Sequence, residues 1–251
     1  MSPSQLPTTS QVSTTTGQVT FPGQAAAPDG PCDLLPMFLM HHAFRRDLTN
    51  FAGAVRATPV ADRRTWRALD RRWQRFATIL HHHHSGEDAY IWPVLVAAVE
   101  AGGTPQDRAT LDAMEAEHAE IDPMLEACAR GFATLARRFD GTARAALAAD
   151  LTRTRDKLAA HLGHEERDAL ALVQRFLSPE DWARLDKQVG AGYPAKLIPF
   201  TLAWIMHDLP ADGRAAAAEF LGRPATVLWS LAFRRPFERT ERAAFRYATA
   251  G

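Results

Sequence analysis

Two short stretches decide the fold expected of this chain: HHHHSGED at residues 81–88 and HLGHEERD at residues 161–168. Each holds a histidine followed four residues later by a glutamate, first His83 with Glu87 and then His161 with Glu165. Side chains four residues apart lie on one face of a helix, so each pair can reach the same interior volume. The repetition indicates two equivalent halves, each contributing one such pair.

Both stretches lie on stripes of apolar residues at alternating spacings of three and four, which are typical of helices that pack in a bundle. Two further stripes carry His41 and His118 at their centres. The stripes are separated by breaks at Thr58-Pro59, residues 102–105, residues 140–142 and Ser178-Pro179. Serine or threonine before proline is a common helix start. The sequence therefore predicts an all-α protein whose residues 32–177 form an up-down-up-down four-helix bundle with additional C-terminal helices.

The chain on either side of the bundle differs in composition. Residues 1–31 are rich in Ser, Thr, Gln and Pro with almost no charge, and we expect them to be a disordered leader. Residues 178–251 contain at least three helical stretches, which we expect to pack on the bundle or to form a homodimer contact. The last of them, residues 234–246, carries five arginines against two glutamates and favours a solvated tail.

The overall composition excludes several classes of protein. The 251 residues hold 29 basic and 29 acidic side chains, so the chain lacks the positive charge of a nucleic-acid binder. Cys32 and Cys128 are too far apart for a metal-binding or redox motif, which favours a reducing compartment. No apolar stretch reaches the roughly 20 residues of a membrane span. We expect a cytoplasmic protein with no nucleic-acid or membrane partner.

The four stripes bring six ionisable residues into one layer of the predicted core: His41, His83, Glu87, His118, His161 and Glu165. Burying such groups is costly unless they are paired or bind metal. Imidazole and carboxylate without thiolate suit iron, manganese or zinc, and two carboxylates in a bundle core favour a pair of metal ions bridged by Glu87 and Glu165. The ligand chemistry favours iron or manganese, and it leaves positions for an oxo or hydroxo bridge and a small ligand.

These motifs resemble those of the hemerythrin-like, or HHE cation-binding, domains. The resemblance rests on four segments in the right order: His41 with residues 45–48, residues 83–88 with Trp92-Pro93, Glu117-His118, and residues 161–166. It covers about residues 33–177. It implies a non-haem di-iron site in a four-helix bundle that binds O2 or related molecules such as NO or peroxide. From this resemblance we expect two iron ions with an oxo or hydroxo bridge, in preference to manganese or zinc. It also implies the same six ligands that the stripes select.

One position departs from the family pattern. Oxygen-carrying hemerythrins have a second histidine four residues before the one on the third helix, and this chain has Met114 there. Methionine is a poor ligand for iron beside hard oxygen donors. Either one iron keeps an extra open position, or a seventh ligand fills it, for which the candidates are Tyr90, Glu115 and Asp122.

Several neighbouring residues compete with the six. A shift of one residue would select His42 in place of His41, or Glu166 in place of Glu165. In the histidine run only His83 lies on the stripe, so we expect His81, His82 and His84 at the surface or outside the ligand set. Glu115 and His118 have the ExxH spacing of ferritin-like proteins, but Leu158 interrupts the matching pair before His161, which disfavours that alternative.

Three functions are compatible with this site. The first is a protein that binds or senses O2, NO or peroxide. The second is an enzyme that disproportionates hydrogen peroxide or reduces NO. The third is a regulatory module whose fold responds to iron or oxygen, because metal binding is linked to folding.

Overall fold

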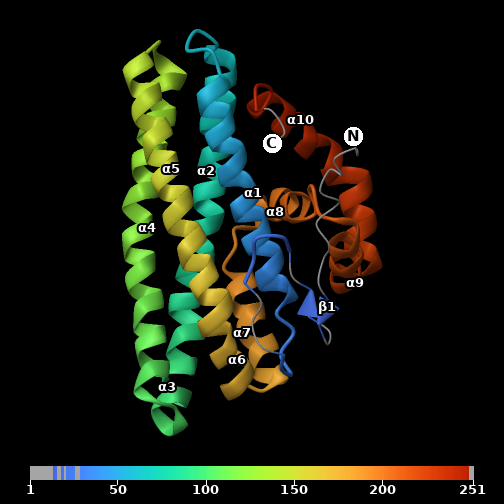
Figure 1. The fold of residues 1–251 in the computed structure, drawn as a ribbon. Coiled ribbons are helices and arrows are strands. Elements are labelled where there is room, and N and C mark those ends of the chain that lie inside the picture. Colours follow the sequence, from blue (N-terminus) through green and yellow to red (C-terminus); the bar gives the residue numbers. More distant parts are fainter. Residues whose placement is uncertain (1–13, 16–17, 20, 26–28, 249–251) are drawn as a thin grey trace, which may run out of the picture.

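The computed structural model describes residues 14–15, 18–19, 21–25 and 29–248, and its centre is a four-helix bundle (Figure 1). The first segment is α1 (Leu35–Ala57) and the third is α4 (Pro105–Arg137). The second segment consists of α2 (Arg63–Gly86), the π-helical turn η1 (Glu87–Ile91) and α3 (Trp92–Gly102). The fourth consists of α5 (Gly141–His164), the π-helical turn η2 (Glu165–Ala169) and α6 (Leu170–Phe176). The predicted all-α fold is confirmed.

The helices begin where the sequence places polar caps. The Thr104 hydroxyl accepts from the Asp107 backbone N–H while the Asp107 side chain accepts from the Thr104 N–H, which completes a capping box. Asp140 accepts from the Ala143 N–H, and Ser178 accepts from the Asp181 N–H at the start of the next helix. These bonds satisfy backbone donors that have no partner inside the helix. The bundle segments are therefore bounded by local chemistry.

The two π-helical turns were not predicted, and both begin at a glutamate of an HxxxE pair. The Trp92 N–H donates to the Glu87 carbonyl and the Leu170 N–H donates to the Glu165 carbonyl, so each bond spans five residues instead of four. Pro93 favours the first wide turn because proline cannot donate to the carbonyl four residues back and clashes with it. No proline follows the start of the second wide turn. The feature that the two turns share is therefore the glutamate at which each begins. Such turns often mark functional sites.

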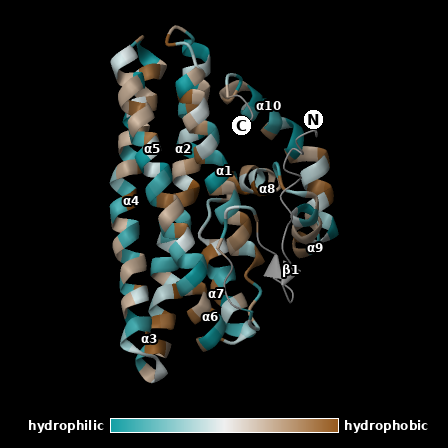
Figure 2. Cartoon of the chain, viewed as in Figure 1, coloured by the Kyte–Doolittle hydropathy of each residue, from teal (hydrophilic) through white to brown (hydrophobic). Residues whose placement is uncertain are grey.

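Apolar clusters lie on both sides of the histidine layer along the bundle. One cluster is dominated by aromatic rings, including Phe44, Phe51, Trp73, Phe76 and Phe132, all fully buried. The other lies toward α3 and α6 and includes Phe38, Ile91 and Leu170. Apolar and polar residues alternate along the bundle helices, as packing on one face requires (Figure 2). The histidine layer is therefore enclosed by hydrocarbon at both ends.

The C-terminal extension packs beside α1 and α2 (Figure 1). Its elements are α7 (Pro179–Ala191), η3 (Ala195–Leu197), α8 (Ile198–Ile205), α9 (Ala211–Leu228), η4 (Trp229–Phe233) and α10 (Arg234–Ala244). Gly222 breaks α9 with a φ of 75°, a left-handed conformation that favours glycine. The extension thus covers the side of the bundle formed by α1 and α2.

A buried ion cluster joins this extension to the bundle. Arg72 of α2 is fully buried, and its guanidinium donates to Glu241 of α10 at 2.6 Å and to Asp47 of α1 at 2.5 Å. The Trp204 indole N–H of α8 donates to the same Asp47 carboxylate at 2.8 Å. The expectation of a solvated tail at residues 234–246 is wrong, because α10 buries Phe237 and Glu241. The pairing of Glu241 with a distant arginine is invisible in the local charge pattern.

Most of the predicted disordered leader, residues 1–31, lies outside the described residues. Within it, β1 (Thr14–Thr15) and β2 (Gln18–Val19) form a short antiparallel pair. Phe21 is buried, and the backbone N–H of Ala25 donates to Glu166 at 2.8 Å. Among the described residues, no helix combines the length and the hydrophobicity needed to cross a membrane.

Candidate metal centre

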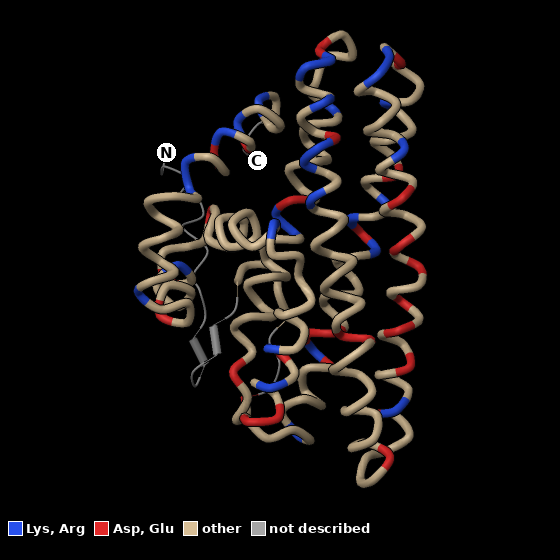
Figure 3. The backbone as a smooth tube through the Cα atoms, turned by 180° about the vertical axis from the view of Figure 1, so that it is seen from behind, with Lys and Arg blue, Asp and Glu red and all other residues tan. Residues whose placement is uncertain are grey.

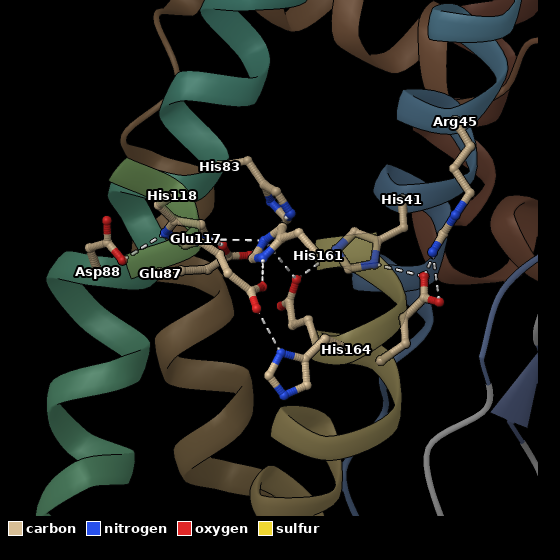
Figure 4. Close-up of polar contacts among 11 residues, drawn as sticks. His41, Arg45, His83, Glu87, Asp88, Glu117, His118, His161 and His164 are labelled. Atoms are coloured by element: carbon tan, nitrogen blue, oxygen red, sulfur yellow. Dashed lines mark hydrogen bonds and ion pairs between the residues drawn. The ribbon is translucent and has the colours of Figure 1, made fainter. Parts of the chain in front are cut away.

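The structure brings all six predicted site residues into one layer between the four bundle segments, and Figure 4 labels five of them. α1 supplies His41, the second segment supplies His83 and Glu87, α4 supplies His118, and the fourth segment supplies His161 and Glu165. None of the six is more than 4% exposed. Whether they bind metal stays a prediction, but their convergence is a property of the fold.

One group of candidate ligands consists of His41, His83, Glu87 and Glu165, whose ligand atoms all lie within 4.8 Å of one another. The His41 Nε2 lies 3.2 Å from Glu165 Oε2, and the His83 Nε2 lies 3.1 Å from Glu87 Oε1. Two imidazoles and two carboxylates on this scale match the size of a single metal site.

A second group consists of His84, His118 and His161. The His118 and His161 Nε2 atoms are 3.2 Å apart. The glutamates of the first group reach toward the second, because Glu87 Oε2 lies 3.6 Å from His118 Nε2 and Glu165 Oε2 lies 3.9 Å from His161 Nε2. Each carboxylate therefore lies between the two groups, as a bridging ligand would.

The expectation that His84 lies at the surface is wrong, whereas its place inside or outside the ligand set stays a prediction. Its side chain is 3% exposed, and its ring stacks on that of His118 with centroids 4.0 Å apart. The inward face of α2 is wide enough here to bury two consecutive residues, His83 and His84. The signal for His84 in the sequence was the run of four histidines at residues 81–84. Only His83 of that run lies on the apolar stripe, so His84 was not selected.

Carboxylates hold three of the imidazoles from outside the layer (Figure 4). The Nδ1 atoms of His41, His118 and His161 lie 2.9 Å from Glu166, 2.8 Å from Asp88 and 2.7 Å from Glu117, respectively. A carboxylate on Nδ1 fixes the ring so that Nε2 points inward as a lone-pair donor, an arrangement typical of histidine ligands. Sequence analysis missed Asp88 and Glu117 in this role, although each adjoins a predicted ligand.

The one-residue alternatives occupy different places from the residues they would replace. His42 is half-buried, with its ring 4.8 Å from that of Phe21, away from the layer that contains His41. Glu166 is fully buried, but it receives a bidentate pair of hydrogen bonds from Arg45 at 2.6 and 3.0 Å as well as contacting His41. Glu166 is therefore committed to Arg45 and to orienting His41.

None of the three seventh-ligand candidates reaches the layer. Tyr90 is 41% exposed and Glu115 is exposed on α4. Asp122 is 3.8 Å from His81, with both side chains largely in solvent. Met114 is fully buried one turn before His118. The additional imidazole that lies in the layer is that of His84, on α2.

Burial and the charges of neighbouring groups shift the pKa values of these residues in different directions. Burial raises the pKa of Glu87 well above its usual range, and the neighbouring Glu165 adds to the rise. Burial also works against a charge on Glu165, but His41 outweighs it and lowers the pKa of Glu165 to about 2. Burial likewise opposes a charge on His41, whereas Glu165 raises the pKa of His41 to about 8. Burial and then His41 lower the pKa of His83 far below its usual value, which leaves a neutral imidazole ready to bind a cation.

Many polar atoms of the layer have no hydrogen-bond partner within the described protein. They include both oxygens of Glu87 and Glu165, the Nε2 atoms of His41 and His83, and both ring nitrogens of His84. Buried polar atoms in folded proteins are nearly always paired, so this concentration requires an explanation. Metal cations bound by these nitrogens and oxygens would satisfy the unpaired atoms, and the donor set fits such ions.

A cavity of about 390 Å³ reaches this layer from the C-terminal extension. It lies between α1, α7, α8 and α9, and His83 forms part of its wall. Apolar side chains such as Met40, Leu202 and Ile205 make up most of the lining, and no lysine or arginine of the described chain contributes. The cavity gives a small uncharged molecule a path to one edge of the histidine layer.

Comparison with known proteins agrees with this geometry. The chain matches the family described as the hemerythrin HHE cation binding domain over residues 37–173, more than half of its length. Neither the curated proteins nor the solved structures gave a match. The matched residues include both HxxxE pairs and the helices that present His41 and His118. The bundle and its buried histidine and carboxylate clusters are thus those of a cation-binding domain, and the chain belongs to the hemerythrin HHE cation-binding family.

Proposed function

We propose that the layer holds two iron ions bridged by Glu87 and Glu165. The observation that carries this proposal is the position of the two glutamates between the two groups of histidines. Glu87 has one oxygen near His83 and the other near His118, and a single oxygen of Glu165 lies near both His41 and His161. Bridging carboxylates with imidazole and no thiolate favour iron over zinc. Such a pair would supply reversible one-electron chemistry and open positions for a small ligand.

The ligand we propose is O2, NO or peroxide. The apolar cavity at His83 supports a small molecule without formal charge, because its walls offer no cation to attract an anion. The apolar clusters on both sides of the layer exclude water from the remainder of the site. His41, His83, His118 and His161 would hold the ions, while Glu166, Asp88 and Glu117 keep the rings oriented.

An enzyme that turns over peroxide or NO is the second candidate, and a surface connection favours it. Glu117 accepts from both His161 and His164, at 2.7 and 2.9 Å, and His164 is one quarter exposed. His164 also lies 3.5 Å from Asp168 at the surface. This chain of titratable groups offers protons a route between solvent and the layer, which a simple carrier does not need.

The test uses the full chain produced in iron-rich medium. We expect iron to co-purify and to give the near-ultraviolet absorption of an oxo-bridged pair, and NO to form a stable adduct with the reduced protein. Oxygen release from peroxide that disappears in Glu87→Ala would assign the enzyme; protease sensitivity that changes sharply with iron alone would assign the regulatory module. Zinc in place of iron, or no metal, would contradict the proposal.

A further inference from the structure

We propose that His84 is the third imidazole ligand of the ion held by His118 and His161, an inference that rests on the proposed two-iron centre. The three residues come from three different segments of the bundle, α2, α4 and α5. Their candidate nitrogens all lie within 4.8 Å of one another. The six ligands predicted from the sequence do not include His84.

Ring geometry places His84 against both partners. Its ring is parallel to that of His118, with centroids 4.0 Å apart and planes 6° from each other. It meets the ring of His161 edge-on at 5.2 Å. The three rings therefore pack directly against one another, and each brings a candidate nitrogen within 4.8 Å of the other two. A cation bound between these nitrogens would account for three imidazoles buried in contact.

The unpaired ring nitrogens of His84 distinguish it from an ordinary core histidine. Both of its ring nitrogens are buried and have no hydrogen-bond partner among the described residues, and the residue is only 3% exposed. A core histidine that served only to fill space would be expected to pair at least one nitrogen. Asp88 and Glu117 accept from the Nδ1 atoms of His118 and His161, and neither forms a hydrogen bond with His84. A metal ion is the partner that we propose for the nitrogens of His84.

The side chain at position 114 of α4 also favours His84 as a ligand. Met114 lies one turn before His118 and is fully buried, so this helix offers the layer a thioether where a second imidazole would fit the spacing. Thioether sulfur is a poor donor to iron beside carboxylates. Without His84, the second ion would have two imidazoles and the shared glutamates. With it, α2 provides through two consecutive histidines what α4 lacks.

The experiment compares His84→Leu with the matched control His81→Leu in the full chain loaded with iron. His81 belongs to the same run, but its side chain is 61% exposed. We expect wild type and the control to hold about two irons per chain and His84→Leu to hold about one. The second iron should dissociate at least tenfold more readily from the variant, since losing a metal-orienting group already costs about 10–100-fold. Two irons with wild-type Mössbauer parameters in His84→Leu would overturn the inference.

A rescue distinguishes a ligand from a packing residue. Met114→His added to His84→Leu places an imidazole one turn before His118, and we expect the second iron to return. If His84→Leu does not fold, His84→Ala with added free imidazole provides a second test. Iron content that imidazole restores would support His84 as a ligand, and iron content that does not respond would contradict that role. Wild type that binds no iron would contradict the two-iron proposal instead, so the two failures are distinguishable.

Discussion

Glu87 is fully buried beside a second buried carboxylate, and its pKa is raised while that of Glu165 is lowered. Only Glu165 has a charged partner, His41, close enough to stabilise its ionised form. Bound cations would remove this asymmetry, because both carboxylates could then be ionised. The site is therefore built at a cost to the metal-free fold.

This cost gives a prediction for Glu87→Leu. Replacing a buried unpaired polar group with an apolar one is often neutral or stabilising. We expect the metal-free variant to unfold at a urea concentration equal to or above that of metal-free wild type, with a gain of about 0–3 kcal/mol, while iron binding is lost. Urea unfolding with a chelator present measures the first effect. A metal-free variant that is clearly less stable than wild type would contradict it.

A second prediction concerns the residue that orients His41. Glu166→Gln removes the charge that Arg45 and His41 share, at 2.6 and 2.9 Å. We expect iron affinity to fall about 10–100-fold with little change in fold, as for other groups that orient metal ligands. Competition with a chelator measures the affinity, and Glu115→Gln at an exposed position is the control. Equal affinities in the two variants would argue against this role.

At the scale of elements, the sequence predicted the helix breaks and the four stripes but not the wide turns. Proline, glycine and capping residues act locally, so the starts of α4 and α7 follow from Thr104 and Ser178. The wide turn at Glu165 has no comparable local residue to announce it. His84 was missed for a related reason, since a narrow stripe assigns one residue per turn to the core. Arg72 and Glu241 pair across most of the chain length, which no local pattern encodes.

The ion cluster that fastens α10 to α2 gives a third prediction. Arg72→Met leaves the buried carboxylate of Glu241 without its cation and leaves Asp47 with Arg46 alone. We expect a loss of about 3–5 kcal/mol in unfolding free energy, as is usual when one partner of a buried pair is removed. Chemical denaturation measures this loss. The neighbouring exposed Arg71→Met should change stability by no more than about 0.5 kcal/mol, and similar losses in both variants would contradict the assignment.

At the scale of the whole molecule, the extension gives the bundle a second layer on one side, and the cavity at His83 lies between the two layers. Both acidic and basic residues occur along the bundle helices (Figure 3). This distribution agrees with the balanced composition and with a ligand that needs no electrostatic steering.

Large apolar side chains remain exposed on the extension, and Leu231 is 79% exposed. The homodimer expected from the sequence stays a prediction, which sedimentation analysis can test.

Access through the cavity can be tested by filling it. Leu202→Trp adds a bulky ring to the wall between α8 and α1, and we expect NO association with the reduced protein to slow at least severalfold while iron content is unchanged. Stopped-flow absorption measures the rate. Leu231→Trp, at a position outside the cavity, should leave the rate unaltered. An unchanged rate in Leu202→Trp would indicate another path to the layer.

The central claim is that one layer of histidines and two glutamates holds a coupled pair of irons. Mössbauer spectroscopy of the full chain enriched in ⁵⁷Fe, combined with iron analysis, tests it most directly. The account predicts about two irons per chain, with the oxidised protein showing the diamagnetic ground state of a spin-coupled ferric pair. A single iron per chain, or two ferric ions that are magnetically independent, would contradict it.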